Sequence, residues 1–176
     1  MTTVLFNALI VVVTVLAMEG VAWLSHRYLM HGPGWGWHAS HHSSKRSLFE
    51  KNDLFALVFA GLAIVLIQAG TSGLWPLQWV GAGMTAYGAL YAIAHDGMVH
   101  RRWPVRYVPR SGYLKRLYQA HRLHHVSCDR EGGVFFGFLI APSERRLREA
   151  VMQARQSRRG AAAAAEELRP VDSWSP

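Results

Sequence analysis

The chain contains one cysteine, Cys128, among 176 residues. A single thiol excludes an intramolecular disulfide framework and a zinc site built from several thiolates. The set of cysteines that holds an iron–sulfur cluster is missing, and so is a glycine-rich fingerprint for flavin or NAD. If this protein carries out redox chemistry, its electrons must come from a partner.

Charged residues are nearly absent from three long apolar runs, 4–24, 54–69 and 74–94, and Glu19 is the one charge within them. About 20 apolar residues cross a bilayer core of about 30 Å as a helix. The first run lacks the basic start and cleavage site of a signal peptide, so we expect it to be retained. A fourth run, 134–141, is too short to span and is expected to be buried or re-entrant. The sequence therefore predicts an all-α integral membrane protein with about three transmembrane helices.

Basic residues are missing from the N-terminus and from the turn at 70–73. All 19 lysines and arginines lie in 27–51, 101–130 and 145–169. If the chain starts outside, three spans place every one of them in the cytoplasm, as the positive-inside rule expects. The same spans exclude a nucleic-acid binder in practice, although the net charge is +8.

Histidine, in contrast, is abundant and clustered. All ten histidines lie in four groups, in which H-x4-H followed by H-x2-H-H occurs twice: His26 and His31; His38, His41 and His42; His95 and His100; His121, His124 and His125. Neutral imidazole is the commonest metal ligand in proteins. Two sets of five predict a site for two metal ions, with each half of the chain contributing one set or both halves sharing. The predicted topology gathers these groups into a cytoplasmic, histidine-rich helical cap.

The two spacings have different consequences on a helix. Residues at i, i+3 and i+4 share a face, so each H-x2-H-H set is expected to converge on one point. Residues five apart are separated by about 140° on an α-helix. One histidine of each H-x4-H pair should therefore lie at a helix end or distortion, for which Gly32, Pro33, Gly34 and Gly97 provide.

The donor count favours iron. Ten histidines leave about five donors for each of two ions, which is more than tetrahedral zinc uses. Iron also gives the site a redox function that zinc lacks. Carboxylates are scarce, unlike the glutamate-rich sites of soluble di-iron bundles.

The ordered histidine string, together with "WLSHRYLMHGPGWGWHASHH", "HDGMVHRRWP", "LYQAHRLHH" and "GVFFGFLIAP", resembles the bacterial β-carotene 3-hydroxylases of the membrane fatty acid hydroxylase/sterol desaturase superfamily. The resemblance runs from about Glu19 to Pro142. It implies a membrane-embedded hydroxylase domain over 1–142, followed by a basic helix and flexible tail over 143–176. It also implies a multi-pass protein of the bacterial inner membrane with its active site on the cytoplasmic side.

The activity implied by the resemblance is O2-dependent hydroxylation of C3 of carotenoid β-ionone rings at a non-haem di-iron centre, giving zeaxanthin from β-carotene. All ten histidines would bind two Fe ions, with O2 as co-substrate, a carotenoid drawn from the bilayer and an external electron donor such as a ferredoxin. No catalytic side chain is expected beyond the metal centre. The basic stretch 101–116 could dock an acidic donor, or it could simply follow the positive-inside rule.

A few further residues are candidates for supporting roles. Glu19, two helical turns before His26, could accept a hydrogen bond from a ligand imidazole or pair with another polar group. Asp96 and Asp129 lie beside histidine groups and are similar candidates. Phe135, Phe136 and Phe138 could line an apolar substrate channel, or they could simply be buried.

Two rival functions and one structural alternative remain at this stage. A fatty acid or sterol hydroxylase or desaturase would keep the same site and change the substrate. A metal transporter would need polar groups at mid-membrane depth, which the spans largely lack. The basic segment 144–159 could lie on the membrane surface or be a solvated helix, and fraying is expected after Gly160.

Overall fold

The computed structural model describes residues 1–43, 49–103, 107–125, 130 and 134–167. All regular structure in these ranges is helical, which confirms the all-α class. The elements are α1 (Thr2–Leu24), the π-helix η1 (Ser25–Met30), α2 (Trp35–His42), α3 (Asp53–Thr71), α4 (Leu77–Tyr91), the π-helix η2 (Ala92–Val99), α5 (Gly112–His124) and α6 (Glu144–Glu167).

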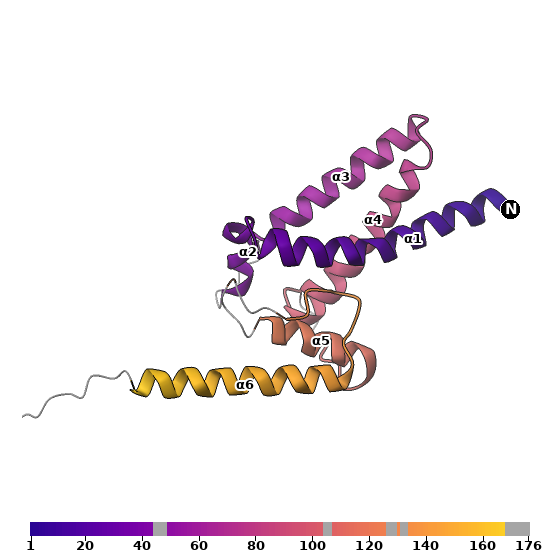
Figure 1. Ribbon diagram of the computed structural model, residues 1–176. Helices are drawn as coiled ribbons and strands as arrows, with labels where there is room; N and C mark the ends of the chain where they lie inside the picture. Colours follow the sequence, from indigo (N-terminus) through magenta and orange to yellow (C-terminus); the bar gives the residue numbers. More distant parts are fainter. Residues whose placement is uncertain (44–48, 104–106, 126–129, 131–133, 168–176) are drawn as a thin grey trace, which may run out of the picture.

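Three long helices, α1, α3 and α4, form the body of the molecule, and α4 packs against both of the others (Figure 1). Their shared core contains Met18, Ala63, Met84 and Tyr87. Two glycines of α4 permit the close approach. A Cβ atom on Gly81 would lie 2.7 Å from the carbonyl oxygen of Ala63 on α3, and one on Gly83 would lie 2.6 Å from Thr14 Cβ on α1. Small residues at helix contacts are typical of membrane bundles.

The two ends of this bundle differ. The N-terminus of α1 and the α3–α4 connection share one end, where the Phe6 and Trp75 rings stack with centroids 5.8 Å apart. The segments α2 and α5, which carry H-x2-H-H sets, lie at the opposite end (Figure 1). The histidine-bearing segments thus gather at one end of the bundle.

Two helices of the described chain are long and apolar enough to cross a membrane, Thr2–Met30 and Asp53–Thr71. Most of their side chains are exposed rather than buried, as expected of helices that face lipid. The third predicted run begins as a helix only at Leu77, and α4 then continues into η2, which contains Asp96. Two of the three predicted spans therefore meet the length and composition of a membrane helix.

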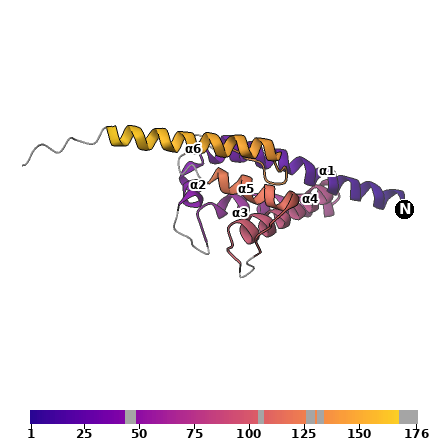
Figure 2. The same cartoon turned by 90° about the horizontal axis from the view of Figure 1, so that it is seen from below.

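The C-terminal helix α6 is longer than predicted. We expected fraying after Gly160, but the helix continues to Glu167. The five alanines that follow Gly160 account for this, because alanine has the highest intrinsic helix propensity. Leu147 is buried where α6 begins, next to α5, and the rest of α6 extends past α2 and away from the body in both views (Figures 1 and 2).

Candidate metal centre

Each H-x4-H pair begins within a π-helix and ends at the residue that directly follows it. The backbone N–H of His31 donates to the carbonyl of His26 at 3.1 Å, and that of His100 donates to the carbonyl of His95 at 2.9 Å. These i to i+5 bonds bring residues five apart onto the same face, which an α-helix would not do. The predicted distortion is therefore present. It takes the form of a π-turn, which precedes Gly32 in the first pair and contains Gly97 in the second.

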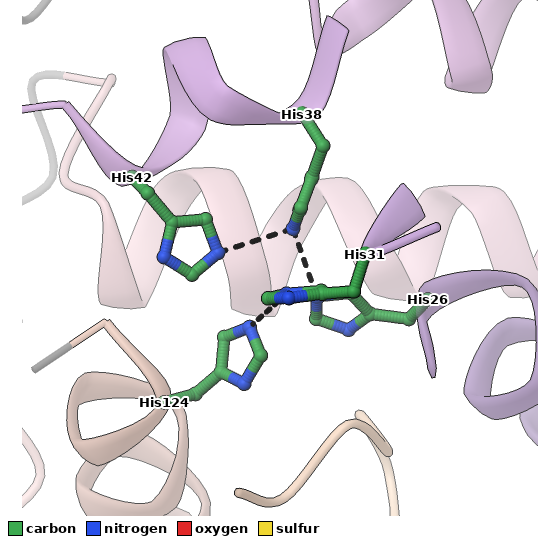
Figure 3. A group of neighbouring side chains, drawn as sticks. All are labelled: His26, His31, His38, His42 and His124. Atoms are coloured by element: carbon green, nitrogen blue, oxygen red, sulfur yellow. Dashed lines mark hydrogen bonds between the residues drawn. The ribbon is translucent and has the colours of Figure 1, made fainter. Parts of the chain in front are cut away.

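Five imidazoles converge in the first group: His26, His31, His38, His42 and His124 (Figure 3). Their donor nitrogens all lie within 4.8 Å of one another. The closest pairs are Nε2 of His38 with Nε2 of His26 and of His42, at 3.1 Å each, and Nε2 of His31 with Nε2 of His124, at 3.2 Å. Four of the five side chains are buried.

Four imidazoles form the second group: His41, His100, His121 and His125. Nε2 of His121 lies 2.9 Å from Nε2 of both His100 and His125. The tenth histidine, His95, adjoins this group, with its Nε2 3.0 Å from Nε2 of His41. The structure thus brings all ten predicted histidines together as two adjacent sets of five.

Both halves of the chain contribute to each set. His124 joins the first group from the second half, and His41 joins the second group from the first half. We expected each H-x2-H-H set to converge on one point, and this was wrong. Residues at i+3 and i+4 lie on either side of a helix face, so adjacent histidines can diverge toward two points.

The outward nitrogens of the imidazoles are held by hydrogen bonds. Nδ1 of His26, His31 and His124 donates to the carbonyl oxygens of Phe136 (3.0 Å), Arg130 (2.9 Å) and Val134 (2.9 Å). His38 Nδ1 donates to Asn52 Oδ1 at 2.7 Å, His41 Nδ1 to Glu50 at 3.1 Å, and His95 Nδ1 to Asp96 at 2.8 Å. These acceptors carry no proton to offer, so each of the six imidazoles has its hydrogen on Nδ1 when neutral.

The inward nitrogens consequently face one another without protons. His31 and His124, His26 and His38, and His41 and His95 each approach Nε2 to Nε2 at 3.0–3.2 Å, although both nitrogens of each pair present a lone pair. Such pairs repel unless a cation lies between them. Two nitrogens bound at right angles, each about 2.1 Å from an ion, are about 3.0 Å apart. The donor set therefore fits a metal ion in each group.

Burial keeps these imidazoles neutral. Burial, reinforced by neighbouring histidines, lowers the pKa of His38 to about 3 and the pKa values of His124 and His125 to about 2. Neutral imidazole is the form that binds metal. These three side chains are thus available as ligands at neutral pH.

A carboxylate network supports the second group. Arg102 pairs with both oxygens of Asp53 at 2.8 and 2.6 Å, and it lies 3.6 Å from Asp96, which holds His95. Asp53 also accepts the backbone N–H of Glu50, which holds His41. Arg102 is therefore committed to the site, and the idea that it belongs to a donor-docking surface is not supported.

Glu19 is buried, and no imidazole is among its hydrogen-bond partners. Its Oε1 accepts the backbone N–H groups of Phe138 and Leu139 at 2.7 Å and of Ile140 at 2.9 Å, while Tyr87 donates to Oε2 at 2.9 Å. Of the two predicted alternatives, the structure shows pairing with other polar groups. Glu19 fixes the 134–141 segment, whose carbonyls hold His26 and His124.

An apolar cavity of about 470 Å³ opens beside the histidines, between α1, α3 and α4. Members of both groups reach it, among them His26 and His95, and residues such as Phe59 and Met84 form its apolar wall. Phe136 and Phe138 line it, but Phe135 does not. Phe135 has a left-handed backbone conformation, with φ 58°, in contrast to an extended residue.

The match to known sequences agrees with this centre. Residues 11–142 match the sequence pattern of the fatty acid hydroxylase family. The chain belongs to the fatty acid hydroxylase family. Among curated members, it is 59% identical to "Beta-carotene hydroxylase" from Pantoea ananas over 90% of both chains. It is 58% identical to the protein of that name from Pseudescherichia vulneris, over 88% of this chain and 87% of the relative.

A plant member of the same family is also similar. "Beta-carotene 3-hydroxylase 1, chloroplastic" from Arabidopsis thaliana is 42% identical over 72% of this chain and 42% of its own length. No solved structure matches the chain.

Several site residues of this family member had no signal in the sequence. Glu50 and Tyr91 touch histidines but belong to no recognisable motif, and nothing in the sequence indicated that Asn52 pairs with His38. Asp96 lies beside a histidine, as its position predicted. Asp129 lies outside the described residues.

Proposed function

We propose that this protein is an O2-dependent monooxygenase that hydroxylates C3 of carotenoid β-ionone rings, converting β-carotene to β-cryptoxanthin and then zeaxanthin. The observation that carries the proposal is the pair of five-imidazole sets facing an apolar cavity. The names and identities of the bacterial relatives support the substrate. We assign the two sets to two Fe ions.

The target carbon explains why such a centre is needed. A ring methylene has no acidic proton, so acid–base chemistry cannot break its C–H bond. When bound, iron would make O2 reactive enough to oxidise this C–H bond. The balanced change is R–H + O2 + 2 e⁻ + 2 H⁺ → R–OH + H2O. The chain itself orients the donor imidazoles, holds the ring against them in the apolar cavity and excludes bulk water.

The two electrons must come from an external donor, for which we propose a ferredoxin. Apart from Arg102, the described basic residues of the 101–116 stretch include Arg110, Lys115 and Arg116. A positive surface of this kind would attract an acidic protein and increase its rate of association.

We further propose that α1, α3 and α4 all cross the bacterial inner membrane, with the histidines at the cytoplasmic end. The common end shared by Phe6 and Trp75 supports this arrangement, since it is consistent with three successive passes that alternate in direction. The hydroxylase domain is then 1–142, which ends where the family match ends, and 143–176 is an appended basic helix and tail.

The decisive experiment is pigment analysis in a bacterium that makes β-carotene. We expect the wild-type chain to produce zeaxanthin, and we expect His38→Ala, His41→Ala, His121→Ala and His124→Ala each to abolish zeaxanthin formation at an unchanged protein level.

The purified protein should bind two iron ions with a di-iron Mössbauer spectrum. If β-carotene stays untouched while a fatty acid or sterol is oxidised, the carotenoid assignment fails. Full activity with one iron, or with zinc alone, would defeat the di-iron assignment.

A further inference from the structure

Tyr91 is held between the cavity and the second histidine group. It is the last residue of α4 and precedes His95 by four positions, and its side chain lines the cavity. Its ring stacks on the His95 imidazole with centroids 4.3 Å apart and planes at 23°, and it also contacts Phe138 at 4.9 Å. Two aromatic neighbours therefore fix the direction of the phenol.

The Tyr91 hydroxyl points at a metal-donor atom. It lies 3.1 Å from Nε2 of His95. Because His95 Nδ1 donates to Asp96, Nε2 is an acceptor and the phenol is the donor. The same Nε2 lies 3.0 Å from Nε2 of His41. The phenol O–H is thus directed at the place where the second group would hold its ion.

A metal ion and the phenol compete for one lone pair. An ion bound by Nε2 of His95 takes that lone pair, and among the described residues the Tyr91 hydroxyl has no other hydrogen-bond partner. The hydroxyl is then a donor at the cavity wall, beside the ion and beside the space for substrate. Tyr87, also on the cavity wall, is different because its hydroxyl is bound to Glu19.

We propose that Tyr91 is a catalytic residue that donates a hydrogen bond to the oxygen molecule reduced at the second histidine group. The inference rests on the proposed monooxygenase function. Fixed donors aimed at developing charge are among the strongest catalytic contributions in proteins. Without this donor, reduction of O2 becomes uncoupled from hydroxylation of the carotenoid ring. Electrons are then lost through O2 + 2 e⁻ + 2 H⁺ → H2O2.

The test compares Tyr91→Phe with wild type and with Tyr118→Phe, in purified, iron-loaded protein. Tyr118 is a buried tyrosine of α5 whose hydroxyl accepts hydrogen bonds from Arg101 and Arg122, and in the part of the chain that the structure describes it has no hydrogen bond or ring contact with a histidine, which makes it a matched control. Four quantities are measured: iron per chain, hydroxylated product per electron pair, H2O2 released, and the N–O stretching frequency of nitric oxide added to the reduced protein as a stand-in for O2.

We expect Tyr91→Phe to keep two iron ions, to lower product per electron pair by about 10- to 100-fold and to release H2O2. Its N–O frequency should shift and lose the sensitivity to D2O that wild type and Tyr118→Phe retain. A fully coupled Tyr91→Phe enzyme, or an unshifted N–O frequency, overturns the inference. So does loss of iron from Tyr91→Phe, because Tyr91 would then serve only to position His95. If wild type itself binds no iron or makes no hydroxylated carotenoid, the proposed function is what fails.

Discussion

At the scale of single residues, the side chains that orient the imidazoles are as informative as the imidazoles. Asn52 is buried at the start of α3 and accepts the Nδ1 hydrogen of His38 at 2.7 Å. This bond turns Nε2 of His38 toward His26 and His42. Groups that hold a ligand in this way commonly change metal affinity by about 10- to 100-fold.

We therefore expect Asn52→Leu to lower iron affinity of the first group by about 10- to 100-fold, because His38 loses its acceptor. Asn52→Asp keeps an acceptor oxygen and should retain most of the affinity. Iron per chain, measured during titration with a competing chelator, checks both. Asn7→Leu, near the exposed start of α1, is the control. Equal iron binding by Asn52→Leu and Asn7→Leu would contradict the role of Asn52.

At the scale of elements, the 134–141 segment depends on one carboxylate. Glu19 on α1 accepts three consecutive backbone N–H groups, and the same segment supplies carbonyls to His26 and His124. The segment is not helical, so its N–H groups need an acceptor from elsewhere. Glu19 thus acts on the metal centre through the backbone of a distant part of the chain.

Glu19→Gln should lower zeaxanthin formation by about 10- to 100-fold, which is less than the loss expected for His38→Ala. The amide is a weaker acceptor than a carboxylate for these N–H groups. Hydrogen exchange should accelerate at Phe138, Leu139 and Ile140. Glu149→Gln, on the exposed part of α6, serves as the control. Unchanged exchange at the three amides would show that Glu19 does not anchor the segment.

The apolar cavity between α1, α3 and α4 offers a second test at this scale. Gly88 lines the cavity, and a Cβ atom there would meet nothing within 4 Å, so a larger side chain enters the cavity without a clash. Gly61 on α3 is equally unobstructed but does not line the cavity. We expect Gly88→Leu to reduce conversion of β-carotene severalfold and Gly61→Leu to leave it unchanged, as measured by carotenoid chromatography. Equal conversion of β-carotene by the two variants would show that the carotenoid does not occupy the part of the cavity beside Gly88.

At the scale of the whole molecule, the three-pass arrangement predicts the side on which each connection lies. A reporter fused after Ser72 should be periplasmic, and one fused after Ser143 should be cytoplasmic, because the basic segments favour the cytoplasm. Alkaline phosphatase and green fluorescent protein fusions read these two sides. A cytoplasmic reporter at 72 would contradict the predicted periplasmic position of the α3–α4 connection, and with it the three-pass arrangement.

Stability of the metal-free protein should depend on pH in one direction. Burial lowers the pKa of His124 and His125 from 6.5 to about 2, so below about pH 6.5 the unfolded chain binds protons that the folded chain refuses. Stability present above this pH is lost progressively as the pH falls. Thermal unfolding in detergent at pH 7.5 and 5 measures the difference. An equal melting temperature at both values would contradict the burial of neutral imidazoles.

The sequence predicted features that depend on local spacing. The helical class, the histidine groups and a distortion between His26 and His31 all follow from residues close together in the chain. The pairing of Asn52 with His38 was not predictable, because the two residues are 14 positions apart and belong to different elements. The carbonyls of Phe136 and Val134 carried no signal at all, since every residue has one. The split of each H-x2-H-H set depends on how α2 and α5 face each other.

The interleaving of the two halves also fixes an order of events during synthesis. The first group has four donors from residues 26–42, but His124 and the carbonyls that hold His26 and His31 come from residues 124–136. A nascent chain that has emerged only through α3 therefore has neither group complete. In the proposed di-iron enzyme, we therefore expect metal to be loaded after α5 has been translated. A chain interrupted before residue 121 lacks donors of both groups, and one interrupted before residue 136 still lacks the Phe136 carbonyl that holds His26.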